Sequence, residues 1–152
     1  MTTFEDSDIR RLPGLLVVDP DSRGSADLAR EIKKLGWQVW VAEDSAAAIE
    51  IYQELRHRID IVLVDLQLPG LQGGSLLAQL AELNPALIRC AMSGEISPYA
   101  AAAFRKMSDT PLFTKPLAVR ALAFTLHEMV APTSRYSNAP RAVLRESRMA
   151  VV

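Results

Sequence analysis

Four polar residues of this chain each follow a short apolar run, at positions where their side chains could do chemistry together. They are two carboxylates, one hydroxyl and one ammonium group: Asp19, Asp65, Ser93 and Lys115. Carboxylates bind hard divalent cations, whereas lysine and serine side chains neutralise and hydrogen-bond phosphoryl oxygens. An aspartate among such groups can be a nucleophile towards phosphorus. These residue types therefore predict a site for an oxyanion and a divalent cation, provided that the fold brings them together.

The run before Asp65 indicates how the fold could do this. Ile61-Val62-Leu63-Val64 is apolar and mostly β-branched, the pattern of a strand buried on both faces. Pro69-Gly70 then supplies turn chemistry. Asp65 is therefore predicted at the carboxyl end of a buried strand, where open α/β sheets form their sites. Taken alone, Asp65 could equally cap the next turn. The rest of the sequence is therefore needed to distinguish a functional role of Asp65 from a turn cap.

Strand and helix patterns alternate five times along the chain, with short connections. Strands are predicted at 15–18, 37–41, 61–64, 87–92 and 111–114, and helices at 22–35, 45–58, 75–83, 98–107 and 119–131. The pair Gly73-Gly74 is predicted to precede the third helix, and Pro132 to end the last one. This alternation predicts the α/β class: a doubly wound, five-stranded parallel sheet with flavodoxin-like strand order 2-1-3-4-5 and helices on both faces. In that order the four polar residues converge on one crevice.

Length and composition exclude several classes of protein. The chain has 152 residues, enough for one domain with a real core, and its 49% apolar and 23% charged residues are typical of a soluble globule. A net charge of −1 gives no nucleic-acid or membrane signature. No apolar run approaches the roughly 20 residues of a membrane span, and the polar N-terminus is not a signal peptide. The single cysteine, Cys90, excludes an internal disulfide framework and indicates a cytoplasmic protein.

The sequence divides into three segments. Residues 1–13 are predicted to be a flexible leader, residues 14–131 the domain, and residues 132–152 a basic tail or linker. The last segment carries four arginines against one glutamate, a net charge of +3. A solvated tail, a binding element and a linker to an output domain all remain open.

The order of these motifs resembles the receiver domains of response regulators in two-component signalling. The resemblance covers about residues 14–131. It is carried by four motifs: Leu15-Leu16-Val17-Val18-Asp19, Val62-Leu63-Val64-Asp65 with Leu68-Pro69-Gly70, Met92-Ser93-Gly94, and Thr114-Lys115-Pro116. Each motif is weak alone, and their specificity lies in all four occurring in order.

The resemblance implies a phosphorelay switch rather than an enzyme. It implies that Asp65 accepts a phosphoryl group from a sensor histidine kinase or phosphotransfer protein, and that Ser93 and Lys115 contact that group. It further implies a Mg²⁺ ion held by Asp19, Asp65 and the backbone carbonyl of Gln67. The small residue Gly94 would leave room for the donor, and the peptide Lys115-Pro116 would be cis.

The chain departs from the family pattern at two positions. The first strand usually ends in two adjacent acids, but here the second is Pro20, whose side chain cannot bind a metal. Asp21 could substitute, although it lies one residue further along. This departure predicts a weakened magnesium site. Three residues before the lysine, where the family usually has an aromatic residue, the chain has Leu112.

Two other interpretations compete with a phosphoacceptor receiver. One is a pseudo-receiver of the same fold that binds partners without phosphorylation, which Pro20 and Leu112 favour. The other is a haloacid-dehalogenase-like phosphohydrolase, suggested by Asp19-Pro20-Asp21 after an apolar strand. In that enzyme Arg23 would stand where Thr or Val is expected, and Asp65 would have no role.

One face of the predicted fold could bind a partner. The resemblance implies that the face made by residues 98–107, 111–114 and 119–131 forms a homodimer or docks an output domain. Within it, the small residues Ala100 to Ala103 stand between Tyr99 and Phe104. The alternative interpretation is that these alanines only reflect good helix propensity.

Overall fold

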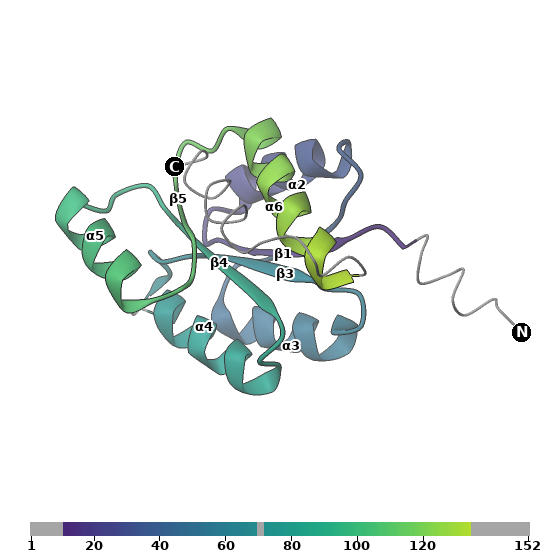
Figure 1. Cartoon of the computed structure of the whole chain (residues 1–152), viewed down its shortest axis with the longest axis horizontal. Coiled ribbons are helices and arrows are strands. Elements are labelled where there is room, and N and C mark those ends of the chain that lie inside the picture. Colours follow the sequence, from purple (N-terminus) through teal and green to yellow (C-terminus); the bar gives the residue numbers. More distant parts are fainter. Residues whose placement is uncertain (1–10, 70–71, 135–152) are drawn as a thin grey trace, which may run out of the picture.

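The computed structural model describes residues 11–69 and 72–134 as a single five-stranded sheet with helices on both faces (Figure 1). All strand pairs are parallel, and the strand order is β2-β1-β3-β4-β5. The predicted α/β class and strand order are therefore confirmed. The elements are β1 (Gly14–Val18), α2 (Ser22–Lys33), β2 (Gln38–Ala42), α3 (Ser45–Leu55), β3 (Ile61–Asp65), α4 (Gln72–Leu83), β4 (Ile88–Ser93), α5 (Pro98–Met107), β5 (Leu112–Thr114) and α6 (Val119–Ser134).

The sheet separates two apolar cores, because successive strand residues point to opposite faces. Leu16 and Val62 face the core under α3 and α4, whereas Leu15 and Leu63 face the core under α2 and α6. Figure 1 shows the same division, with α2 and α6 on one side of the sheet and α3 and α4 on the other. Every residue of β1 and β3 is buried, which confirms the prediction from the apolar run before Asp65.

Local sequence signals fix where the helices begin and end. The side chains of Asp21, Asp44 and Ser97 each accept a hydrogen bond from a backbone N–H in the first turn of α2, α3 and α5, which satisfies a donor that the helix cannot. Gly36 has a φ of 93°, a left-handed conformation that glycine adopts without strain, and it follows the end of α2. These caps place the loops that carry the polar residues.

Four predicted helix boundaries were wrong. The helices predicted to end at residues 35 and 58 end earlier, at Lys33 and Leu55. The helix α4 begins at Gln72 and includes Gly73, so the glycine pair does not precede it. A Cβ atom on Gly73 would lie 2.6 Å from the carbonyl oxygen of Asp65, so glycine is needed there for close packing. The helix α6 continues past Pro132 to Ser134. A proline removes one backbone hydrogen bond from a helix but leaves the others, so it need not end the helix where it stands.

The described part of the leader contacts the amino end of the sheet. Arg11 donates two hydrogen bonds of 3.1 Å to the Asp60 carboxylate, which also accepts from the Gly14 N–H at 2.9 Å. Residues 1–10 and 135–152 lie outside the described residues, so the flexible leader and the basic tail stay predictions. Within 11–69 and 72–134, no helix has the length and apolar character needed to cross a membrane.

We expect Gly14→Ala to destabilise the fold. A Cβ atom at Gly14 would lie 1.7 Å from the Arg58 carbonyl oxygen, so the backbone of two segments would have to move apart. Such overpacking costs about 1–3 kcal/mol or more. The matched control is Gly74→Ala, because a Cβ there meets nothing within 4 Å and alanine favours a helix. Urea denaturation should show a lower midpoint for Gly14→Ala and an unchanged or higher one for Gly74→Ala; equal midpoints would contradict the packing argument.

Candidate functional site

The four predicted site residues lie at the carboxyl ends of four neighbouring strands. Asp19 follows β1, Asp65 ends β3, Ser93 ends β4 and Lys115 follows β5. Asp19, Asp65 and Ser93 are only 4%, 3% and 1% exposed, respectively, although all three are polar. Buried polar side chains need partners, so their placement at one edge of the sheet has to be explained by contacts within the site.

The ammonium group of Lys115 joins the two carboxylates. Its Nζ atom lies 2.8 Å from Oδ2 of Asp19 and 2.8 Å from Oδ2 of Asp65. The other oxygen of each carboxylate accepts a backbone hydrogen bond from two residues further along. Asp19 Oδ1 accepts from the Asp21 N–H and Asp65 Oδ1 from the Gln67 N–H, each at 2.8 Å. Both carboxylates are thus held with one oxygen towards the lysine and one towards their own loop.

Burial and the two neighbouring carboxylates have opposite effects on the pKa of Lys115. Partial burial of the ammonium group lowers the pKa, because desolvation disfavours the charged form. Hydrogen bonds and charges from Asp19 and Asp65 act in the opposite direction and outweigh burial, so that the pKa of Lys115 is raised above its ordinary value. Lys115 is therefore a cation in the site at neutral pH.

Ser93 and Gly94 approach this cluster from β4. The Ser93 carbonyl accepts a hydrogen bond from the Lys115 N–H at 3.0 Å, which ties the ends of β4 and β5 together. Gly94 lies next to Lys115: a Cβ atom there would be 3.5 Å from the lysine Cβ, an ordinary contact. The peptide between Lys115 and Pro116 is cis, as predicted.

The side chain of Gln67 contributes a contact that the sequence analysis missed. Its Oε1 atom accepts a hydrogen bond of 3.2 Å from the Gly94 N–H, so the side chain joins the loop after β3 to the loop after β4. The sequence analysis considered only the backbone carbonyl of Gln67. Because β3 and β4 are neighbours, residues just after the ends of these strands are candidates for a contact. This placement is the signal in the sequence that could have revealed the contact between Gln67 and Gly94.

The two carboxylates are suitable ligands for Mg²⁺. One nitrogen atom lies 2.8 Å from an oxygen of each, so a single point between them can contact both side chains. Mg²⁺ usually keeps several waters and binds only one or two protein carboxylates, so Asp19 and Asp65 are a sufficient set. Across residues 11–69 and 72–134 there is no group of three or more His, Cys, Asp or Glu side chains that could hold a metal.

Asp21 is engaged elsewhere. Its Oδ1 atom accepts a hydrogen bond of 3.1 Å from the Gly24 N–H and so caps α2. The other carboxylate oxygen also faces the first turn, since a Cβ atom on Gly24 would lie 2.5 Å from Asp21 Oδ2. In this structure the Asp21 side chain therefore contacts the first turn of α2, and not the carboxylates of Asp19 and Asp65.

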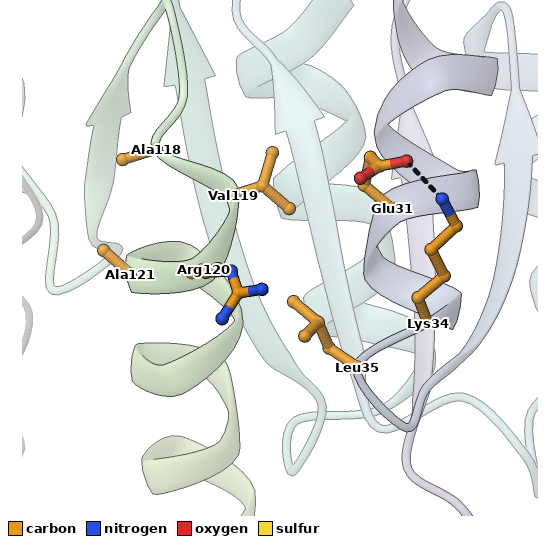
Figure 2. A pocket seen from close by; sticks show the side chains of 7 residues that line it. All are labelled: Glu31, Lys34, Leu35, Ala118, Val119, Arg120 and Ala121. Atoms are coloured by element: carbon orange, nitrogen blue, oxygen red, sulfur yellow. Dashed lines mark hydrogen bonds and ion pairs between the residues drawn. The ribbon is translucent and has the colours of Figure 1, made fainter.

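A groove opens from the cluster to the surface. It has a volume of about 670 Å³ and lies between α2 and the loops after β4 and β5, with Asp19, Gln67, Gly94 and Lys115 among the residues that line it. We call it the site groove. A second hollow of about 580 Å³ adjoins it and shares Glu31 and Val119 with it; we call this the flanking hollow (Figure 2).

Leu112, where the family usually has an aromatic residue, lies away from the site groove. Its side chain is buried in the core on the α3 and α4 side of the sheet, while the neighbouring Phe113 is buried in the other core. Both apolar side chains of β5 therefore serve packing in this structure.

Comparison with known proteins agrees with this geometry. The family model described as the response regulator receiver domain matches residues 15–127. The chain is 32% identical over 120 residues to the sensor kinase CckA of Brucella abortus and 34% identical over 85 residues to the transcriptional activator protein PfeR of Pseudomonas aeruginosa. These matches cover 76% and 55% of this chain but only 12% and 27% of the two relatives. The chain therefore corresponds to a small part of the curated relatives that it matches.

Solved structures show the same fold. A response regulator receiver domain protein from Clostridium thermocellum superposes with a TM-score of 0.71 at 20% identity, over 80% of this chain and 97% of that one. The receiver domain of the hybrid histidine kinase CckA superposes with a TM-score of 0.62 at 22% identity, over 76% and 96% of the two chains. At these identities the likeness is one of fold.

Proposed function

This chain belongs to the response regulator receiver family of two-component signalling, and on that premise we propose that Asp65 accepts the phosphoryl group. One observation carries the proposal: the Lys115 ammonium lies 2.8 Å from both Asp65 and Asp19 at the carboxyl edge of the sheet. This arrangement supplies a carboxylate nucleophile, a second carboxylate and a fixed cation. It supports a phosphoacceptor role better than a structural ion pair, because an open groove leads to it.

The neighbouring residues have distinct roles in this proposal. Lys115 is positioned to neutralise charge on the transferred group, and Ser93 ends the adjacent strand, from which its hydroxyl can hydrogen-bond a phosphoryl oxygen. The backbone N–H of Gln67 holds Asp65 in place through Oδ1. Receiver domains generally bind Mg²⁺ at the phosphorylation site. Here we propose Asp19, Asp65 and the backbone carbonyl of Gln67 as its ligands; the ion would spread the charge of the phosphoryl group.

Mass measurement of the intact protein tests the proposal. Incubation with a small phosphodonor and Mg²⁺ should add one acid-labile phosphoryl group per chain, without continuous turnover of a generic phosphatase substrate. Turnover of that substrate would contradict the proposal that the chain is a phosphoacceptor and not an enzyme. A folded protein that stays unmodified with every donor would contradict the phosphoacceptor role.

We further propose that the donor is a sensor histidine kinase or phosphotransfer protein in the cytoplasm. Receiver domains interact with sensor histidine kinases, and two of the similar proteins are themselves named sensor kinases. The output surface that we propose is the face of α5, β5 and α6, where a second copy or an output domain would dock. Two large side chains on these helices support it: Tyr99 is 86% exposed and Phe124 is 64% exposed.

A surface variant tests this output face. Ala102 is exposed on α5, so Ala102→Glu adds a charge there without filling the core, and combined with Phe124→Ser it should weaken any self-association. Ala101 is unsuitable, because it is 8% exposed and packs against the core. Light scattering should give a lower average mass for the double variant than for the wild type at a concentration where the wild type associates. An equal mass for both, with equal output-domain binding, would contradict the proposal.

A further inference from the structure

The acidic side chains around the site groove have no role in the chemistry described above. Four carboxylates line the groove beyond the reacting cluster: Asp21, Asp27, Glu31 and Glu95. All four residues are exposed to solvent. Among the described residues that line this groove, Lys115 is the one cation, and its charge is already shared between Asp19 and Asp65. Apart from Lys115, every charged side chain that lines the site groove is therefore acidic.

Basic side chains lie instead in the flanking hollow. Lys34 and Arg120 line it, and Figure 2 shows Lys34 paired with Glu31 on α2 while Arg120 extends from α6 into the space between the two helices. The Glu31–Lys34 pair at 3.0 Å and a pair between Asp27 and Arg30 offset part of the acidic charge. Both pairs are solvent-exposed, so they reduce the field at the groove without abolishing it.

Apolar side chains also line the groove, so it has area for contact with a protein. Leu28, Leu117 and Val119 are half-buried and line it together with the buried Met92. Apolar contact of this kind is available to a protein surface but not to a small anion. The groove thus offers a protein donor binding energy that a small donor does not obtain.

We call the carboxylates of Asp21, Asp27, Glu31 and Glu95 the rim of the site groove. We propose that the rim selects the phosphoryl donor by charge: it favours a protein donor with basic side chains around its phosphorylated residue, and it disfavours small anionic phosphodonors. This inference rests on the proposed function of Asp65. The charged rim acts on the approach of the donor, because electrostatic fields around a cleft change the local concentration of charged reactants. The rim residues Asp27 and Glu31 are therefore specificity residues, without a part in bond making.

Two small donors that differ in charge test the inference. In both reactions an oxygen of Asp65 forms a bond to phosphorus. With acetyl phosphate the P–O bond to the acetyl group breaks and acetate leaves; with phosphoramidate the P–N bond of the zwitterion breaks and ammonia leaves. Near neutral pH acetyl phosphate carries about two negative charges and phosphoramidate about one. A negative rim must therefore slow the reaction of acetyl phosphate more, because the logarithm of the slowing is proportional to the charge of the donor.

The variant Asp27→Asn/Glu31→Gln removes two rim charges. At an ionic strength of about 0.01 M we expect its initial rate of Asp65 labelling to rise about tenfold with acetyl phosphate and about threefold with phosphoramidate. The logarithm of the first factor should be about twice that of the second. At about 1 M salt, where the Debye length is about 3 Å, both factors should approach one.

The matched control is Glu50→Gln/Glu54→Gln. Both residues are exposed on α3, which covers the opposite face of the sheet, and the change in net charge is the same. Labelling of the control should stay within about twofold of the wild type with both donors. The donor selection alone would be overturned by equal acceleration of labelling in the two double variants. It would also be overturned if the rim variant were accelerated by the same factor with both donors. Absence of label in all variants with both donors would overturn the proposed function, and this inference with it.

Discussion

Asp65→Asn should abolish acid-labile phosphorylation of this chain. The phosphoryl group can form a bond only with an ionised carboxylate oxygen at this position, and an amide oxygen is a far weaker nucleophile. The substitution keeps the shape of the side chain, and the amide oxygen can still accept the Gln67 N–H that now binds Oδ1. Lys115 retains its contact with Asp19. The fold should therefore survive, and a loss of label would report on chemistry.

Two comparisons make this result specific. Asp109→Asn changes an exposed carboxylate between α5 and β5 and should be labelled as the wild type is. Asp19→Asn changes the other carboxylate bound to Lys115, so it should slow labelling while one phosphoryl group is still added to Asp65. Intact-mass measurement followed by mapping of the modified peptide distinguishes the cases. Full labelling of Asp65→Asn, or mapping of the label to Asp19, would refute the assignment of the acceptor.

The sequence predicted that these polar residues converge because each of them marks the end of a strand. In a chain where strand and helix patterns alternate, an apolar run such as 61–64 predicts a buried strand. The parallel strand order then brings Asp19, Asp65 and Lys115 to one edge of the sheet, whatever the conformation of the loops. The loops themselves were less predictable. The Gln67 side chain could have pointed to solvent, and only its bond to the Gly94 N–H shows that it spans two loops.

The misjudged positions share a physical cause: one residue type serves several purposes. Gly73 was predicted to precede the third helix, but it lies within α4 and allows close approach to the Asp65 backbone. The sequence left open whether Asp21 replaces the missing metal ligand; in the structure its side chain caps α2, a role typical of aspartate before a helix. Pro132 was expected to end the last helix, but the helix continues to Ser134. Such choices depend on packing, which a pattern of residue types does not contain.

Pro20→Asp should tighten Mg²⁺ binding and speed the labelling of Asp65. The structure provides two carboxylates within reach of one cation, Asp19 and Asp65, and Lys115 now contacts both. A third carboxylate at position 20 would add a charge-assisted contact worth on the order of 1–3 kcal/mol, which is about a fivefold to 160-fold change in the dissociation constant. Pro20 is exposed, so the substitution buries no new charge. Calorimetric titration with Mg²⁺ measures the affinity directly, independently of phosphorylation.

The companion variant Asp21→Asn tests whether Asp21, and not the absent acid at position 20, determines the affinity for Mg²⁺. The asparagine oxygen can still accept the Gly24 N–H and cap α2, so helix stability should be nearly unchanged. If the cap is the only role of Asp21, then Asp21→Asn should leave Mg²⁺ affinity within about twofold of the wild type, apart from the small effect of one exposed charge. If instead Pro20→Asp changes neither affinity nor rate while Asp21→Asn abolishes both, Asp21 is the missing ligand. The carboxylate that now faces the first turn of α2 would then have to rotate towards Asp19 when the ion binds.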